Sequence, residues 1–219
     1  MAARQNGLAR LLDAIVMDDA EAVRMVRDAP ELARLVVEEE CFIETIAHAL
    51  YAGDTALHFA AAAVKPVVVE ALLRAGANPN AANRRGALAL HYACDPRPVS
   101  ALVWSPGAQR KAIELLVDAG SRIDHAEKSG ASPLHRAVRA RSPVAVKCLL
   151  ERGADVNASH GKSRTTPLHL ALHATGASGT KGAHAEQQAI VDLLLDGGAD
   201  SRARDARGKA APLPRRKPR

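Results

Sequence analysis

Histidine and cysteine are the side chains through which this sequence could support catalysis or bind a metal ion. The 219 residues include nine His and three Cys. His169 and His173 stand four residues apart, a spacing that places two imidazoles on one helix face, as in zinc sites. However, no Glu follows the first His, and no third ligand lies close by in the sequence. We therefore predict that the protein holds no metal ion.

Cysteine nucleophiles and phosphate-binding loops find no better support. Cys41, Cys94 and Cys148 form no CxxC pair and are too few for a disulfide framework, which favours a reducing cytoplasm. Cys94 and Cys148 fall at apolar positions of helical patterns, where Cys packs as a small hydrophobic residue. The Gly-rich stretch 176–183 lacks the spacing of a nucleotide-binding loop. The sequence thus predicts no catalytic residue, no cofactor and no small-molecule substrate, and hence a protein that is not an enzyme.

Four of the histidines occupy the same place in a repeated string of residues. The versions of this string are GDTALHFAA (53–61), GALALHYAC (86–94), GASPLHRAV (130–138) and RTTPLHLAL (164–172). Each is followed by a second string that contains a Gly near its end: VVEALLRAGAN (68–78), AIELLVDAGSR (112–122), AVKCLLERGAD (145–155) and IVDLLLDGGAD (190–200). The second string carries an apolar stripe at helical spacing. Such self-similarity is typical of stacked-repeat proteins.

These strings resemble the ankyrin-repeat family, whose repeat is about 33 residues long and carries a T-P-L-H-x-A motif. The resemblance covers residues 53–200 as four repeats. It implies an all-α solenoid of stacked helix-turn-helix units with β-turn fingers. In this family the motif opens the inner helix, and its His has a structural role, which here falls to His58, His91, His135 and His169. The glycines that end the outer helices in a left-handed conformation are Gly76, Gly120, Gly153 and Gly198.

The repeats alternate in length. From the motif His to the closing Gly, the separations are 18, 29, 18 and 29 residues, so repeats two and four each carry 11 additional residues. In the family's geometry, these insertions lie on the rim opposite the fingers. Ser105 and Pro106 are suited to cap and open a lengthened outer helix in repeat two.

The segments that flank the repeats are less regular. Residues 1–30 resemble a divergent helix pair that caps the array and ends at Pro30. Residues 31–52 replace the usual short finger, and we expect them to form an atypical, helical linker. Residues 201–219 contain a truncated fifth finger followed by a basic tail that we expect to be disordered. Because a solenoid needs covered end faces, either the tail or a partner would cover repeat four.

The positive charge of the chain is localised. The formal net charge is +6, yet residues 201–219 alone hold eight Lys or Arg and one Asp, which leaves the first 200 residues nearly neutral. Weak nucleic-acid association through the tail and fingers is one alternative function, but a 2% aromatic content offers few stacking platforms. A regulatory subunit of an enzyme is another. No apolar run approaches the ~18 residues of a membrane span, so we expect no membrane partner.

The resemblance also implies a binding face, because ankyrin proteins contact partners through the finger tips and the exposed ends of the inner helices. The positions that correspond here are Arg84, Arg85, Asp95, Lys128, Ser129, Arg139, Lys162, Arg164, His173, Arg207 and Lys209. They are mostly basic, so we predict a cytoplasmic, non-catalytic scaffold or adaptor whose protein partner has an acidic patch. Trp104, in the first insertion, either packs against the lengthened helix or anchors a second contact. The Ala-, Arg- and Val-rich composition suggests a bacterial source.

Overall fold

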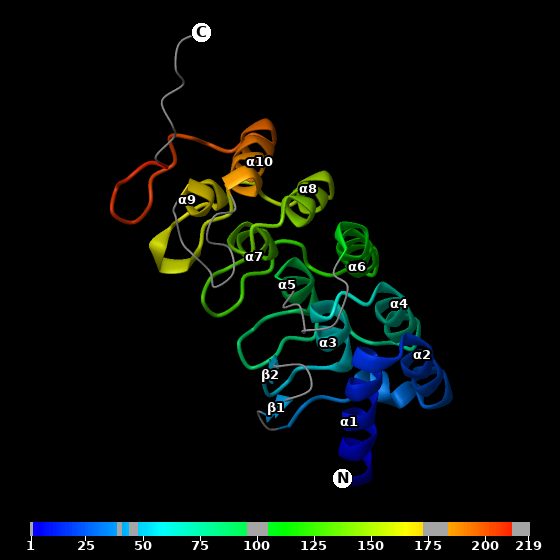
Figure 1. The fold of residues 1–219 in the computed structure, drawn as a ribbon. Helices are drawn as coiled ribbons and strands as arrows, with labels where there is room; N and C mark the ends of the chain where they lie inside the picture. The colour runs from blue at the N-terminus through cyan, green and yellow to red at the C-terminus, as the bar shows by residue number, and fades with distance from the viewer. Residues whose placement is uncertain (1, 39–40, 44–47, 96–104, 173–183, 212–219) are drawn as a thin grey trace.

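The computed structural model describes residues 2–38, 41–43, 48–95, 105–172 and 184–211, and these form an elongated array of helix pairs. The first and the last of the described residues lie at opposite ends of this array (Figure 1). The inner helices of the four repeats are α3 (Ala56–Ala62), α5 (Ala89–Cys94), α7 (Pro133–Arg139) and α9 (Pro167–Leu172). The outer helices are α4 (Pro66–Arg74), α6 (Pro106–Asp118), α8 (Pro143–Glu151) and α10 (His184–Asp196).

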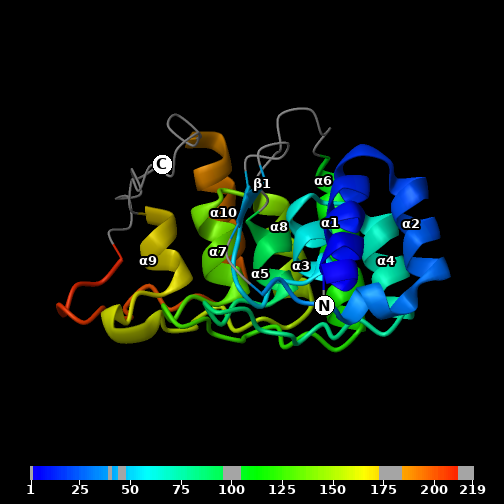
Figure 2. The same cartoon turned by 90° about the horizontal axis from the view of Figure 1, so that it is seen from below.

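Each helix packs against its counterpart in the neighbouring repeat, so the array has an inner and an outer layer. Leu57, Leu90, Leu134 and Leu168 follow one another through the inner layer and are all buried. The connecting fingers run along one edge of the array, beneath the ends of the helices (Figure 2). The all-α solenoid predicted from the sequence is confirmed. Within the described ranges, no helix is long and apolar enough to cross a membrane.

The inner helices begin as their motif predicts. The Ser132 hydroxyl accepts a hydrogen bond from the N–H of His135, and Pro133 occupies the first helical position. Thr55 and Thr166 make the same contact in repeats one and four. Repeat two has Leu88 at this place, and because Leu has no hydroxyl, its inner helix begins without a side-chain cap of this kind.

The N-terminal segment adds a further helix pair, α1 (Ala2–Met17) and α2 (Asp19–Asp28), which packs against the first repeat. The Asp18 carboxylate opens α2 by accepting hydrogen bonds from the N–H groups of Ala20 and Glu21. Asp19 is paired with Lys65 of the first repeat at 2.7 Å. The helix pair α1–α2 therefore lies where the sequence predicted a capping unit.

The helical interpretation of residues 31–52 was wrong for the described residues that follow Arg34. A short 3-10 helix, η1 (Pro30–Arg34), is followed by an antiparallel hairpin of β1 (Cys41–Ile43) and β2 (His48–Leu50), with Phe42 opposite Ala49. Val37 is hydrogen-bonded to the first finger through its backbone. Its N–H donates to the carbonyl of Asp54 at 2.7 Å, and its carbonyl accepts from the N–H of Gly53 at 2.8 Å. These pairings hold the chain extended, and Val, Ile and Phe in the segment suit that conformation. The segment thus extends the first finger.

Part of each insertion lengthens an outer helix. Helices α6 and α10 have 13 residues each, whereas α4 and α8 have nine. The predicted cap is confirmed, because the Ser105 hydroxyl accepts from the N–H of Ala108 and Pro106 is the first residue of α6. The remaining insertion residues, 96–104 and 173–183, lie outside the described part of the chain.

Two glutamines at the same place in the lengthened helices were not anticipated. The amide of Gln109 donates to the Ala93 carbonyl at 2.9 Å, and that of Gln187 donates to the Ala171 carbonyl at 2.7 Å. Carbonyls at the end of a short helix lack partners within the helix. The outer-helix extension therefore completes the hydrogen bonding of the inner helix beside it.

Glycines control both the helix ends and one contact between fingers. Gly76, Gly120, Gly153 and Gly198 all have φ between +85° and +89°, which confirms their predicted left-handed role. Gly130, in the finger of repeat three, lies directly against Gly161, in the finger of repeat four. A Cβ built at Gly130 would collide with the Gly161 backbone.

This contact yields a stability prediction. Gly130→Ala should lower the free energy of unfolding by about 3 kcal/mol, because it combines a strained φ of +91° with a backbone clash. Gly107→Ala is the matched control: its Cβ meets nothing within 4 Å, and Ala favours helix, so stability should hold or rise. Urea unfolding of both variants measures the difference. Equal midpoints for the two variants would contradict the proposed contact.

Candidate functional site

The four motif histidines join each inner helix to the following finger. In each, the ring Nδ1 accepts a hydrogen bond from the backbone N–H at the start of its own helix. The opposite nitrogen, Nε2, donates to a carbonyl of the next finger, with partners and distances His58–Ala87 (3.1 Å), His91–Ala131 (3.3 Å), His135–Thr165 (3.2 Å) and His169–Lys209 (3.0 Å). All four side chains are buried. This geometry requires a neutral imidazole that carries its proton on Nε2.

Burial keeps these rings neutral. Desolvation lowers the pKa of both His91 and His135 to about 4, and it lowers the pKa of His58 as well. A proton added to Nδ1 would also remove the acceptor for the helix N–H. The motif histidines therefore act as structural connectors, and their geometry does not suit proton transfer to a substrate.

The finger tips are also joined to one another through the backbone. Each tip is a tight turn, as in the hydrogen bond from the N–H of Gly86 to the carbonyl of Asn83 at 2.8 Å. The three hydrogen bonds that link adjacent tips are Arg84 N–H to Ala52 O (2.7 Å), Lys128 N–H to Arg85 O (2.9 Å) and Ala206 N–H to Ser163 O (2.8 Å). At the remaining junction, Gly130 and Gly161 are in direct contact. The tips thus form one continuous edge.

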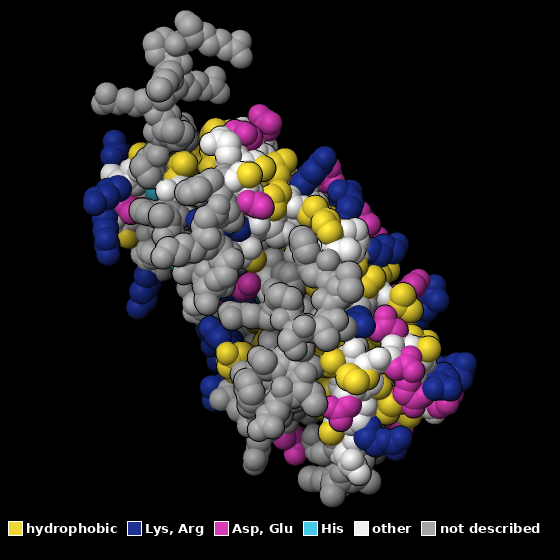
Figure 3. All heavy atoms as spheres, viewed as in Figure 1, with side chains coloured by type: hydrophobic (Ala, Val, Ile, Leu, Met, Phe, Trp, Pro, Cys, Tyr) yellow, Lys and Arg dark blue, Asp and Glu magenta, His cyan; other side chains and the backbone are white. Residues whose placement is uncertain are grey.

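Most of the basic residues predicted for the binding face lie on these tips. We call them the basic ridge, and its members, all exposed, are Arg84, Arg85, Lys128, Lys162, Arg164, Arg207 and Lys209. The Asp205 carboxylate, in the finger of Arg207 and Lys209, is engaged with backbone, because it accepts hydrogen bonds from the N–H groups of both residues. In Figure 3, Lys and Arg stand along the left margin, on the finger side of Figure 1, whereas both charge signs alternate along the right margin. The ridge carries an excess of positive charge.

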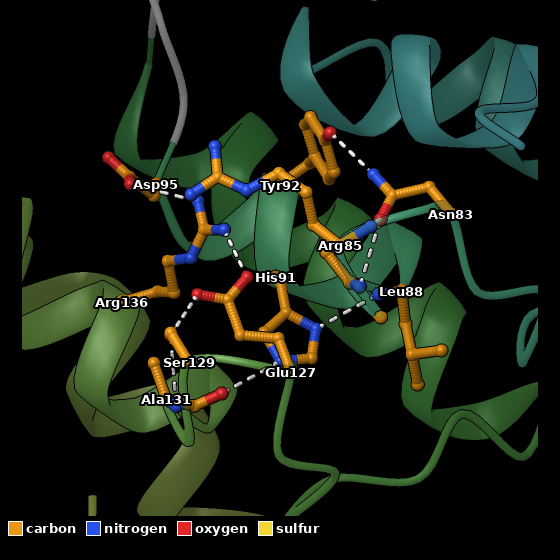
Figure 4. A network of polar contacts seen from close by, with 12 residues as sticks. Asn83, Arg85, Leu88, His91, Tyr92, Asp95, Glu127, Ser129, Ala131 and Arg136 are labelled. Atoms are coloured by element: carbon orange, nitrogen blue, oxygen red, sulfur yellow. Dashed lines mark hydrogen bonds and ion pairs between the residues drawn. The ribbon is translucent and has the colours of Figure 1, made fainter. Parts of the chain in front are cut away.

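Three other predicted binding residues are used inside the protein. Asp95, at the end of α5, contacts Arg136 at 3.4 Å and Arg139 at 2.6 Å. Arg136 also pairs with the buried Glu127, whose carboxylate accepts a hydrogen bond from Ser129 at 2.8 Å. Figure 4 shows Arg136 extending between Asp95 and Glu127. Asp95, Ser129 and Arg139 therefore belong to a charge-balanced cluster that connects α5, α7 and the finger between them.

Sequence reasoning missed Arg136 and Glu127, the central pair of this cluster. Arg136 lowers the pKa of Glu127 despite burial of that carboxyl, so the ion pair persists in the fold. The sequence did contain a signal for Arg136. After its His, the motif of repeat three reads RAV, whereas the other repeats have the uncharged FAA, YAC and LAL.

A second polar cluster lies at the N-terminal end of the same surface. The fully buried Asp54 accepts hydrogen bonds from the Asn83 amide and the Tyr51 N–H, both at 2.8 Å, and from the Tyr92 hydroxyl at 3.3 Å. Burial raises the pKa of Tyr92. Arg85 donates to the Tyr51 hydroxyl at 2.9 Å, and its guanidinium lies 5.0 Å from the ring centroid of Tyr51. This residue of the ridge is therefore held in place by a cation–π contact.

The remaining predictions concern residues that are less informative. Trp104 and His173 lie outside the described residues, and so does the tail beyond Ala211. Cys94 and Cys148 are buried free thiols, and desolvation raises the pKa of both, which makes them poor nucleophiles. The fifth finger docks on repeat four through the contact between His169 and Lys209.

Comparison with known proteins identifies the class. Residues 52–84 match the family model for a single ankyrin repeat, and residues 102–205 match a model for three ankyrin repeats. The matches cover more than half of the chain, which therefore belongs to the ankyrin-repeat family.

Individual relatives are similar over much of this chain. The mouse B-cell lymphoma 3 protein homolog is 32% identical over 158 residues, which is 72% of this chain and 31% of the relative. The chicken nuclear factor NF-kappa-B p105 subunit is 38% identical over 153 residues, 67% of this chain and 13% of the relative. Mouse NF-kappa-B inhibitor delta is 32% identical over 165 residues, which is 65% of this chain and 44% of the relative. The chain thus spans less than half of each. These relatives are vertebrate and do not support the bacterial source suggested by composition.

The buried histidines predict a specific pH dependence. Between pH 6.5 and about 4, the unfolded chain binds protons on His91 and His135 that the folded chain excludes, so the free energy of unfolding should fall as pH is lowered. Each site contributes up to about 3 kcal/mol across that range. Denaturant unfolding at a series of pH values measures the slope. His135→Gln, which keeps a donor and an acceptor but does not titrate, should show a shallower slope. A flat profile from pH 6.5 to 4.5 would count against this assignment.

The ion cluster predicts a second stability effect. Arg136→Ala should cost about 3 kcal/mol, because it leaves Glu127, whose side chain is 3% exposed, without its counter-ion. Adding Glu127→Gln to that variant should restore part of the loss. Lys147→Ala, which removes an exposed pair with Glu151, should cost less than about 0.5 kcal/mol. Thermal or urea unfolding distinguishes the variants, and equal losses for Arg136→Ala and Lys147→Ala would refute the role of the cluster.

Proposed function

We propose that this protein is a non-catalytic scaffold or adaptor, and that its basic ridge binds a partner protein through an acidic patch. The observation that carries the proposal is a set of exposed ridge cations whose side chains make no hydrogen bond or ion pair within the described part of the chain. These are Lys128, Lys162, Arg164, Arg207 and Lys209. Unneutralised charge of one sign on a continuous edge steers an oppositely charged partner and fixes its orientation.

The relatives support a protein partner. One of them is named an inhibitor of NF-kappa-B, and another is a subunit of NF-kappa-B. Those names describe proteins that act through assembly with other proteins. The ankyrin repeats are the part that this chain shares with them, so we assign partner binding to the repeats.

We further propose that the protein works in the cytoplasm. The support is the chemistry of Cys94 and Cys148, which are both free thiols. Disulfides form and persist in oxidising compartments, whereas thiols stay reduced in the cytosol.

Charge reversal tests the binding face. A variant with Lys128→Glu, Lys162→Glu and Arg207→Glu should fail to capture the proteins that the wild type captures from a native lysate. A matched control reverses Arg74, Lys111 and Lys147 on the outer helices, which gives the same net charge and should retain those proteins. Quantitative mass spectrometry compares the three samples, and added salt should weaken capture by the wild type.

Two outcomes would contradict the proposal. In one, the ridge variant and the outer-helix control capture the same proteins as the wild type. In the other, nuclease treatment of the lysate abolishes capture, which would mean that the ridge binds nucleic acid phosphates rather than protein carboxylates.

A further inference from the structure

The spacing of the finger tips restricts the shape of the acidic partner, provided that the proposed function holds. Each repeat finger is a narrow hairpin, closed for example by the N–H of Glu127 donating to Ala131 O at 3.0 Å and the N–H of Asp205 donating to Lys209 O at 2.9 Å. Adjacent tips are hydrogen-bonded to each other, as Lys128 is to Arg85. Neighbouring hydrogen-bonded strands lie about 4.8 Å apart, and each finger supplies two, so equivalent tip residues recur about every 10 Å.

The number of cations at each tip adds a second restriction. Four of the five finger tips are basic: three of these present two basic residues each, the finger of Lys128 presents one, and the first finger, at Gly53 and Asp54, presents none. The pairs are Arg84 with Arg85, Lys162 with Arg164, and Arg207 with Lys209. A partner complementary to the four basic tips therefore needs carboxylates on one face at each step of about 10 Å, with two of them at three of the four steps.

An α-helix meets both requirements and an extended chain does not. Seven helical residues rise about 10.5 Å and return to nearly the same face, and residues four apart are neighbours on that face. In a strand, successive side chains point to opposite faces. A polyproline helix repeats its face every three residues, over about 9 Å, and so offers one side chain per step.

We propose that the partner segment is an acidic α-helix that lies across the finger tips, with pairs of carboxylates at positions i and i+4 that recur every seven residues. About 25 residues would cover the four tips. The helix contacts the tips rather than the surface of the inner helices, because the charges of that surface are already balanced. Asp95 and Glu127 neutralise Arg136 and Arg139 there, and the side chains of Asp95 and Glu127 are only 12% and 3% exposed.

Synthetic peptides test this register directly. The first peptide is an Ala- and Gln-rich helix of about 25 residues with Glu pairs at i and i+4 in each heptad. The second has the same composition with its Glu residues distributed evenly around the helix. The third is Pro-rich with a Glu at every third position, and the fourth is a disordered polyglutamate of equal charge. Circular dichroism verifies that the first two are equally helical, and fluorescence anisotropy at low salt measures their affinity for the full chain.

The first peptide should bind about tenfold more tightly than the second, since several matched charge pairs are gained. It should lose that advantage with the Lys128→Glu/Lys162→Glu variant and keep it with Arg74→Glu/Lys147→Glu. Equal binding of the two helices, or tighter binding of the Pro-rich peptide, overturns the helical partner. If polyglutamate alone binds the wild type and not the ridge variant, the helix is refuted while the acidic-partner function stands. If no acidic peptide binds, both the helical partner and the proposed acidic-partner function are refuted.

Discussion

The hydrogen bond from each buried motif histidine to the next finger is the contact on which the rest of the structure depends. The two ring nitrogens of each histidine connect the start of its inner helix to a carbonyl of the following finger. The first of these connections runs from His58 to Ala87, and the last runs from His169 to Lys209. Because a repeat contacts only its neighbours, this bond transmits the position of each helix pair to the next finger. The finger tips can then contact one another and form a continuous edge.

The stacking of the repeats divides the charged side chains discussed above into two sets, one buried within the fold and one exposed on the finger tips. Within the fold, Asp54, Glu127 and Arg136 have partners, so burial of their charge is compensated by hydrogen bonds and ion pairs. On the tips, cations such as Lys128 and Lys162 face solvent. The buried set specifies how the repeats fit together, and the exposed set is the one that we propose to bind a partner. A protein with this division can change its binding specificity at the tips without altering the contacts that stabilise the array.

The sequence predicted whatever depends on local pattern. The Ser105 cap and the left-handed conformation of Gly153 involve only residues within one turn or helix. The repeat and the structural role of His135 came from the resemblance to the ankyrin family, and the partner of this histidine in the next finger, Thr165, was not predicted. Contacts between distant residues were out of reach. Val37 is hydrogen-bonded to Gly53 and Asp54 of the first finger, Gln109 donates to a carbonyl 16 residues earlier, and Asp95 binds arginines of the next repeat. Asp95 and Arg139 were predicted as binding residues because a one-dimensional pattern does not show that they form an ion pair with each other.

The central claim is that the motif histidines hold the finger tips in place, and hydrogen exchange of the tip amides tests it most directly. The Lys128 amide donates to Arg85 O, and His91 contacts Ala131 in the same finger. In the wild type, the amides of Lys128 and Ala206 should both be protected. Replacement of His91 by Ala should abolish protection at Lys128 and leave Ala206, in the last finger, protected. Unchanged protection of Lys128 in that variant, or rapid exchange of Lys128 in the wild type, would contradict the account.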